Sequence, residues 1–96
     1  MLIDELHEKK DLILSIAKKY GATDVRVFGS VAKGQENHNS DIDFLISMEK
    51  GYDLFKQRLA LQEELINLLG KKVDLLVRHE LNKHLAQEIL SSSKEI

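Results

Sequence analysis

The sequence predicts an α/β (α+β) fold in which helices pack on a small mixed β-sheet. Three observations lead to this prediction: apolar residues recur at helical spacing in three stretches, short stretches rich in Val, Ile and Leu lie between them, and glycines follow two of the helical stretches. The expected order is helix, strand, short helix, strand, helix, strand, helix. A length of 96 residues fits one domain, and we expect residues 1–96 to form it.

The N-terminal part is expected to hold one long helix and the first strand. Apolar residues fall mostly at helical spacing over residues 4–20, and Gly21 is placed to end that helix. The stretch DVRVF, residues 24–28, alternates and is rich in valine, which is typical of a strand.

The C-terminal part is expected to hold two more strands and two helices. The stretch DIDFLIS, residues 41–47, begins by alternating and becomes continuously apolar, as a central strand does. Asp53 can cap a helix that Gly70 ends. The stretch KVDLLV, residues 72–77, predicts the third strand, residues 81–90 the last helix, and SSSKEI a frayed tail or a further turn. The middle helix carries one apolar stripe of Leu54, Leu61, Leu65 and Leu68, with Phe55, Leu59, Ile66 and Leu69 beside it.

Composition excludes several classes of protein. The formal net charge of -2 provides no basic field that would gather long nucleic acid. The chain has no cysteine, so disulfides, thiolate zinc sites and cysteine nucleophiles are ruled out, and a reducing compartment fits. No apolar run approaches the roughly 18 residues of a membrane span, and the N-terminus lacks a signal-peptide core. We therefore expect a cytoplasmic protein without a membrane partner.

The dipeptide Gly29-Ser30 follows directly on the predicted first strand. A short helix can begin at Ser30 or Val31 and end near Gly34, and the start of a helix presents free backbone N–H groups that suit an anion. Gly29 lets the backbone come close to a ligand, and Ser30 adds a hydroxyl donor. The dipeptide is common, so an ordinary turn with a serine cap is the alternative interpretation.

The aspartates of the second and third strands indicate a cation site. Asp41 and Asp43 share one face of a strand, about 6.7 Å apart along it. Unpaired carboxylates on one face repel each other, so they either lie at a solvated strand end or are neutralised by a cation. Asp74 is a third charge inside an apolar run, and neighbouring strands would bring the three carboxylates together. Carboxylate oxygens suit Mg²⁺, which proteins usually hold with one or two carboxylates and substrate phosphates.

Together, GSVAKG, SDIDFLI and KVDLLV resemble the nucleotidyltransferase domain of the DNA polymerase β superfamily, with its Gly-Ser turn, Asp-x-Asp strand and third aspartate on a later strand. More narrowly, the chain is similar to the minimal nucleotidyltransferases (MNT) of bacteria and archaea. The match covers residues 24–77, and the flanking helices fit the same layout. One difference is Lys33, where many members have arginine; lysine keeps the charge but loses the planar fork.

The resemblance implies a reaction and a set of residues. The reaction would transfer a nucleoside monophosphate, AMP from ATP, to a hydroxyl, with two Mg²⁺ ions stabilising the attacking and leaving oxygens. The implied catalytic and metal-binding residues are Asp41, Asp43 and Asp74, and Asp74 could also take the proton of the acceptor. The implied nucleotide-binding residues are Gly29, Ser30, Lys33 and Ser40, although for Ser40 capping of the turn before the strand is the favoured role.

The resemblance also implies a partner. About 19 residues follow the third strand, so half of a nucleotide site would lie open for a partner protein or a second copy to complete. Members of this group are often encoded beside a small helical HEPN-type toxin, which the minimal nucleotidyltransferase silences as an antitoxin by adenylylating a tyrosine. Tyr20, Tyr52, Phe55 and the apolar residues of the last helix could serve the interface, but we expect them in the core.

Two alternative functions remain open at this point. One is a non-catalytic antitoxin that neutralises its partner by contact alone. The other is a metal-dependent phosphohydrolase or a nucleic-acid-processing transferase that uses the same three aspartates. Retention of Asp41, Asp43 and Asp74 favours catalysis over contact, because three charges are costly to place in an inert sheet.

Overall fold

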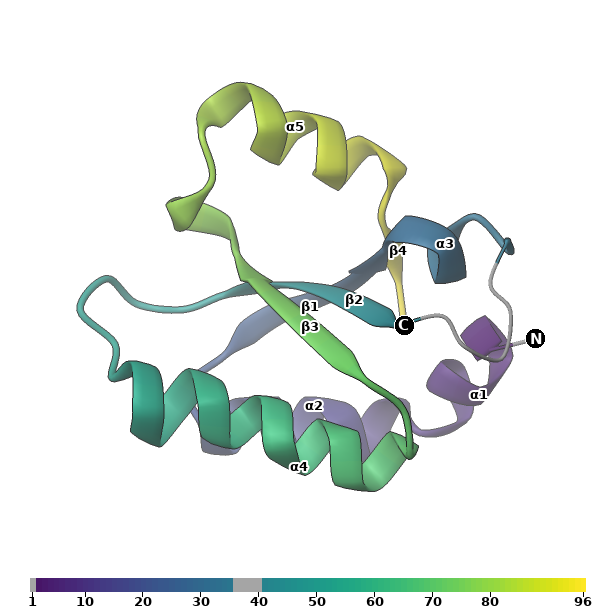
Figure 1. Cartoon of the computed structure of the whole chain (residues 1–96), viewed down its shortest axis with the longest axis horizontal. Coiled ribbons are helices and arrows are strands. Elements are labelled where there is room, and N and C mark those ends of the chain that lie inside the picture. Colours follow the sequence, from purple (N-terminus) through teal and green to yellow (C-terminus); the bar gives the residue numbers. More distant parts are fainter. Residues whose placement is uncertain (1, 36–40) are drawn as a thin grey trace.

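The computed structural model describes residues 2–35 and 41–96. Within these residues a four-stranded sheet has the order β3-β2-β1-β4 (Figure 1). Strand β1 (Thr23–Phe28) pairs antiparallel with β2 (Ile42–Ser47), and β2 pairs parallel with β3 (Val73–Val77). The predicted mixed sheet is therefore confirmed. The expected tail instead forms a short strand, β4 (Lys94–Glu95), antiparallel to β1, and sequence patterns missed it because it has only two residues.

One face of the sheet forms the core. Alternate residues of the three long strands point to this face and are buried: Val25, Val27, Ile42, Phe44, Ile46, Val73, Leu75 and Val77. Helices α2 (Lys10–Lys19) and α4 (Ala60–Leu69) cover it, on the same side of the sheet in Figure 1. The opposite face carries the other half of each strand, which is half-buried or exposed apart from Leu45. We call it the open face.

The single helix expected over residues 4–20 is two helices. α1 (Leu2–Glu8) and α2 meet at Lys9, where the backbone leaves helical geometry at φ -96° and ψ 11°. α1 contacts α3 (Gly29–Ala32), whereas α2 packs on β1 and α4. One straight helix could not make both sets of contacts, so packing against the folded chain overrides the continuous periodicity of the sequence.

The segment after β2 begins with η1 (Leu54–Leu59), a π-helix that continues into α4. Asp53 caps it as predicted, because its Oδ1 accepts hydrogen bonds from the backbone N–H groups of Phe55 at 3.0 Å and Lys56 at 2.9 Å. The predicted apolar stripe is correct at Leu61 and Leu65, which are buried, and Leu69, predicted beside it, is buried too. The prediction is wrong in η1, where Leu54, Phe55 and Leu59 are 43%, 75% and 41% exposed. A π-turn holds more residues than an α-turn, so α-helical spacing assigns these side chains to the wrong face.

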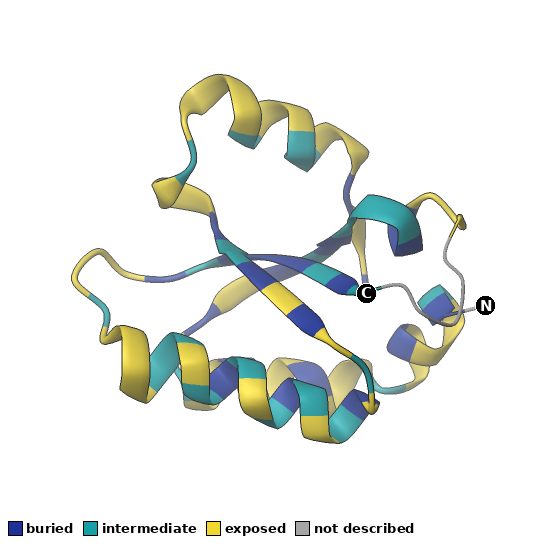
Figure 2. Cartoon of the chain, in the orientation of Figure 1, coloured by how far each residue is buried: buried dark blue, intermediate teal, exposed yellow. Residues whose placement is uncertain are grey.

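The last helix lies across the open face. After β3 come η2 (Arg78–Glu80) and α5 (Lys83–Ser92), which lies on the opposite side of the sheet from α4 (Figure 1). Asn82 caps α5 by accepting a hydrogen bond from the N–H of Leu85 at 2.8 Å. No residue of α5 is buried, as the colours of Figure 2 show, so the expected placement of its apolar residues in the core is wrong. No helix in the described part of the chain is long and apolar enough to cross a membrane.

Side chains of η1 and α4 cover the outer edge of β3. Gln62 donates to the carbonyl of Val73 at 2.7 Å, and Arg58 donates through Nη2 to the carbonyl of Leu75 at 3.0 Å. These carbonyls alternate with those that face β2, so they are the acceptors that an edge strand leaves free. Arg58 also lies 3.2 Å from Glu80, which ties η1 to η2.

Candidate active site

Asp43 and Asp74 lie side by side on the open face. They are direct partners in the parallel register of β2 and β3, and Phe28 of β1 stands opposite Asp43 on its other side. Asp41 comes immediately before β2 and is half-buried, as Asp43 is, while Asp74 is exposed. Among the described residues, no cationic side chain forms an ion pair with any of the three.

The three carboxylates affect one another electrostatically. Burial, followed by the negative charges of Asp74 and Asp41, raises the pKa of the Asp43 carboxyl above its ordinary value. Residues 2–35 and 41–96 contain no group of three His, Cys, Asp or Glu side chains that could hold an ion by themselves. The donor chemistry suits a hard divalent cation held by one or two carboxylates together with phosphate oxygens.

Gly29 brings the turn after β1 against this pair of strands. Its φ is +74°, and a Cβ atom added there would lie 2.5 Å from Oδ2 of Asp43. Only glycine combines a left-handed backbone with such a close approach. The sequence signal, Gly-Ser directly after a strand, therefore corresponds to a turn that lies against Asp43, one of the three predicted carboxylates.

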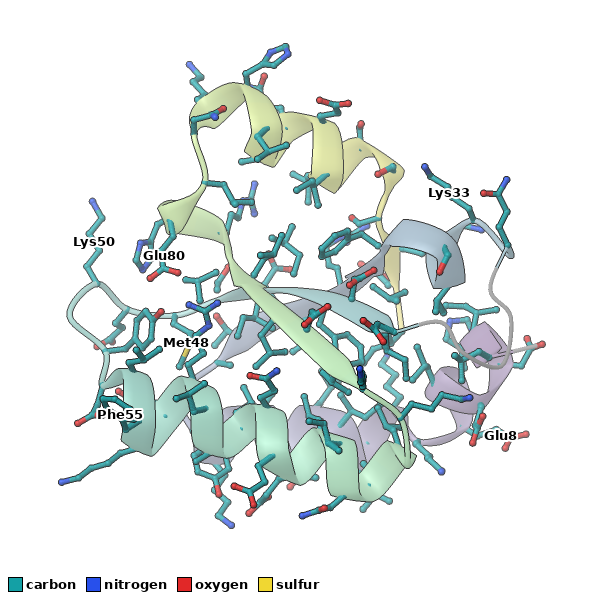
Figure 3. The ribbon with its side chains drawn as sticks, viewed as in Figure 1. Glu8, Lys33, Met48, Lys50, Phe55 and Glu80 are labelled. Atoms are coloured by element: carbon teal, nitrogen blue, oxygen red, sulfur yellow. The ribbon has the colours of Figure 1, made fainter. Side chains whose placement is uncertain are left out.

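The structure places the three remaining predicted site residues differently. Ser30 follows Gly29 in α3, is half-buried, and has no side-chain hydrogen bond within the described residues. Lys33 stands at the C-terminal end of α3, exposed and directed outward in Figure 3, so the structure does not bring it to the carboxylates. Ser40 lies outside the described residues.

Sequence reasoning missed the apolar neighbour of the site. Phe28 shares the open face with Asp43 and is only half-buried there. The signal was available, because alternation in DVRVF places Val25 and Val27 on one face and Phe28 on the other. This ring gives the carboxylate site an apolar wall on the side of β1.

Comparison with known proteins identifies the class to which this fold and these residues belong. Residues 10–96 match the sequence model of the family described as "Polymerase beta, Nucleotidyltransferase". The chain therefore belongs to the polymerase β nucleotidyltransferase family, which confirms the predicted resemblance and the predicted fold.

Two curated relatives are named as protein adenylyltransferases. The chain is 32% identical over 91 residues to a Methanocaldococcus jannaschii protein named "putative protein adenylyltransferase", an alignment that covers 95% of this chain and 97% of the relative. It is 33% identical to protein adenylyltransferase MntA of Thermococcus cleftensis, over 78% of this chain and 75% of that one.

Two solved structures are similar to this chain in fold and in sequence. A structure described as a "putative minimal nucleotidyltransferase" has a TM-score of 0.85 and 33% identity, and the match covers 97% of this chain and 94% of the other. A structure described as a toxin-antitoxin with AMP-PNP has a TM-score of 0.73 and 25% identity, over 85% and 67% of the two chains.

Proposed function

We propose that this chain is a magnesium-dependent protein adenylyltransferase that moves AMP from ATP to a tyrosine hydroxyl of a small helical partner. In this proposal the partner is a HEPN-type toxin and the chain is its cytoplasmic antitoxin. The observation that carries the proposal is the pairing of Asp43 with Asp74 on the open face, with Gly29 against the Asp43 carboxylate. The names of the relatives, protein adenylyltransferases, support the choice of acceptor class.

The chain's own residues supply binding and proton transfer. Backbone N–H groups at Gly29 and Ser30, with the Ser30 hydroxyl, would donate hydrogen bonds to the phosphates. The acceptor oxygen would attack the α-phosphorus, the bond from that phosphorus to the bridging oxygen would break, and pyrophosphate would leave. A carboxylate oxygen of Asp74, the exposed member of the set, would take the phenolic proton.

The negative charge on the reacting oxygens also has to be stabilised, and a divalent cation at the carboxylates fits this requirement. Asp41, Asp43 and Asp74 would hold Mg²⁺, which would stabilise negative charge on the attacking and leaving oxygens. The unpaired carboxylates and the raised pKa of Asp43 favour a cation there, because a positive charge removes the repulsion. Lys33 would act only at a distance, since its ammonium is exposed away from the site.

The open face explains why a partner would matter. Half of the nucleotide would face solvent, and an acceptor protein that docks over it would exclude water from the reaction. A transferred AMP adds a phosphate charge and bulk to the partner, which opposes RNA binding at the modified surface.

A test in cells separates catalysis from contact. A HEPN-type protein, taken as the toxin candidate, is expressed with the parent chain or with an Asp41→Ala/Asp43→Ala double variant. A Glu8→Ala/Asp11→Ala double variant is the matched control, since it removes two exposed carboxylates from α1 and α2. We expect protection and an added AMP mass on the partner with the parent and the control, and neither with the first variant.

The contact-only antitoxin is the second candidate, and one observation favours it. Leu54, Phe55 and Leu59 form an exposed apolar patch that no catalytic step uses. If the Asp41→Ala/Asp43→Ala variant is expressed equally, binds the partner and protects as well as the parent, with no rise in the partner's mass, the chain acts by contact.

A further inference from the structure

A groove runs along α5 beside η2, and α5 lies across the open face of the sheet (Figure 1). The groove has a volume of about 340 Å³ and is lined by Arg78, Leu81, Lys83, Ala86, Gln87 and Leu90, which we call the α5 groove. Arg78 also lines a neighbouring pocket of about 360 Å³ with Ser47, Met48 and His79. Either volume is within the range of small-molecule sites, and Arg78 joins the two.

α5 is held at its ends while its inner side remains unfilled. At the C-terminal end, Arg26 donates through Nε to the Ser93 hydroxyl at 2.7 Å and lies 3.7 Å from Glu95. At the N-terminal end, Asn82 caps the first turn. Ala86 and Leu90 remain only half-buried although they line the groove. A ten-residue helix is marginal without packing, so a groove left open along it is a place where a ligand would add stability.

The groove lies on the same side of the sheet as the carboxylate site, although none of the three aspartates lines it. Arg78 directly follows β3 and comes four positions after Asp74, so about 13 Å of extended chain separates the two residues. Asp43 and Asp74 stand at the beginning of β2 and β3, so the open face extends from them toward Arg78. An extended nucleoside triphosphate spans a comparable length.

We propose that the α5 groove holds the nucleoside of the nucleotide whose phosphates lie at Gly29, Ser30 and Asp43. This inference rests on the proposed function and assigns the part of the substrate that the carboxylate site does not contact. Leu81 and Leu90 provide apolar walls, and the guanidinium of Arg78 provides a plane on which a base stacks. Asp24 lies 3.3 Å from Nη1 of Arg78 and so helps to fix that plane. The amide of Gln87 offers both a donor and an acceptor to the edge of the base.

The test fills the groove without touching the carboxylates. Ala86→Phe places a ring in the groove, and Glu88→Phe adds the same ring to an exposed position of α5 outside the lining. Binding of AMP-PNP and of inorganic tripolyphosphate, each with magnesium, is measured by titration calorimetry for both variants and the parent. Ala86→Phe should weaken AMP-PNP binding by about tenfold or more and change tripolyphosphate binding less than about twofold, because only AMP-PNP carries a nucleoside. Glu88→Phe should behave as the parent.

A milder variant covers the case in which Ala86→Phe fails to fold. Gln87→Ala leaves the groove open, and it should weaken AMP-PNP binding by a few-fold with tripolyphosphate binding unchanged. If the parent binds AMP-PNP and the folded variants bind it equally well, the groove does not hold the nucleoside and the proposed function stands. If AMP-PNP binding is unchanged while AMP transfer to the partner is lost, the groove takes the acceptor, which also overturns the inference. If the parent does not bind AMP-PNP, the proposed function itself is wrong.

Discussion

Gly29 illustrates how one residue serves both the backbone and the site. Alanine at this position would have to adopt φ near +74° and place Cβ 2.5 Å from Oδ2 of Asp43. The left-handed conformation alone costs about 1–2 kcal/mol, and the carboxylate must also move. Gly29→Ala should therefore lower the free energy of unfolding by about 2 kcal/mol or more and weaken binding of magnesium AMP-PNP, as measured by urea unfolding and titration calorimetry.

Gly51→Ala is the matched control for that change. Gly51 has φ +86° but nothing within 4 Å of an added Cβ, so it carries the conformational cost without the clash. We expect a loss of about 1 kcal/mol of stability and unchanged nucleotide binding. Equal effects of the two substitutions would mean that the contact between Gly29 and Asp43 has no importance for the site.

Protonation of Asp43 makes the stability of the chain depend on pH. Its pKa is raised by burial and by Asp74 and Asp41, so the folded chain binds this proton more tightly than the unfolded chain does. This tighter proton binding stabilises the folded chain fully at pH values below the pKa of the unfolded chain, near 3.8. The stabilisation is lost as the pH rises through the raised pKa of the folded chain. At pH 7, Asp43→Asn should therefore increase the free energy of unfolding by about 0.5 kcal/mol, the scale of a like-charge pair across strands.

Thermal melting with and without magnesium completes this test. Magnesium should raise the melting temperature of the parent and of an Asp11→Asn control, whose exposed carboxylate lies on α2, but not that of Asp43→Asn. Equal stabilisation of all three chains by magnesium would rule out a cation site at Asp43.

At the scale of elements, the edge of β3 is protected by two side chains. Arg58 and Gln62 satisfy the carbonyls of Leu75 and Val73, and both are one turn apart on the helical segment. The double variant Arg58→Ala/Gln62→Ala should lose about 1–2 kcal/mol of stability and self-associate through the freed edge. Sedimentation velocity over a range of concentrations measures the association.

A control variant of the same segment, Lys56→Ala/Glu63→Ala, removes two exposed side chains. It should remain as stable and as monodisperse as the parent. A double variant at Arg58 and Gln62 that stays in the oligomeric state of the parent at every concentration would show that these hydrogen bonds do not guard the edge.

Sequence patterns were sufficient for the strands and for their charged residues. The alternation around Asp43 and Asp74 predicted both strands and the shared face, because periodicity in a strand depends only on the local backbone. Patterns failed where tertiary packing decides: at Lys9, where α1 turns toward α3, and in η1, where a π-helix turns Phe55 outward. The two residues of β4 carried no periodic signal at all, and their pairing with β1 depends on a contact distant in sequence.

The candidate site was predictable in part for the same reason. The sequence identified Gly29 and the three aspartates as special, since glycine and unpaired charge are unusual beside apolar strands. It did not reveal that Gly29 touches Asp43, that Lys33 points away, or that α5 leaves a groove open. These are properties of distances between elements, which a one-dimensional pattern does not contain.

At the scale of the whole molecule, the apolar patch of η1 is separate from the carboxylates. Phe55 is the most exposed member, at 75%, and Figure 3 shows it at the η1 end of the continuous helical ribbon that η1 and α4 form. Phe55→Ser should leave the free energy of unfolding within about 0.5 kcal/mol of the parent and weaken binding of the helical partner by about tenfold. Nucleotide binding should not change. Titration of the partner into each chain provides the measurement.

Leu12→Ser is the corresponding control, because Leu12 is 55% exposed on α2 and stands apart from η1 in sequence. It should retain the partner affinity of the parent. A patch that serves no docking function would give the same affinity for the parent and both variants.

The protected sheet has a consequence for recognition. The outer edge of β3 is occupied by Arg58 and Gln62, and the other edge, β4, has only two residues, both charged. A partner strand added to a sheet edge is held by backbone hydrogen bonds, which any protein can form, so this mode of binding discriminates weakly between partners. A chain with both sheet edges closed must distinguish its partners by side-chain contacts. Each mismatch then leaves a gap or an unpaired polar group. A genome could therefore encode several paralogues of such a chain, and a few surface substitutions would make each paralogue specific for its own partner.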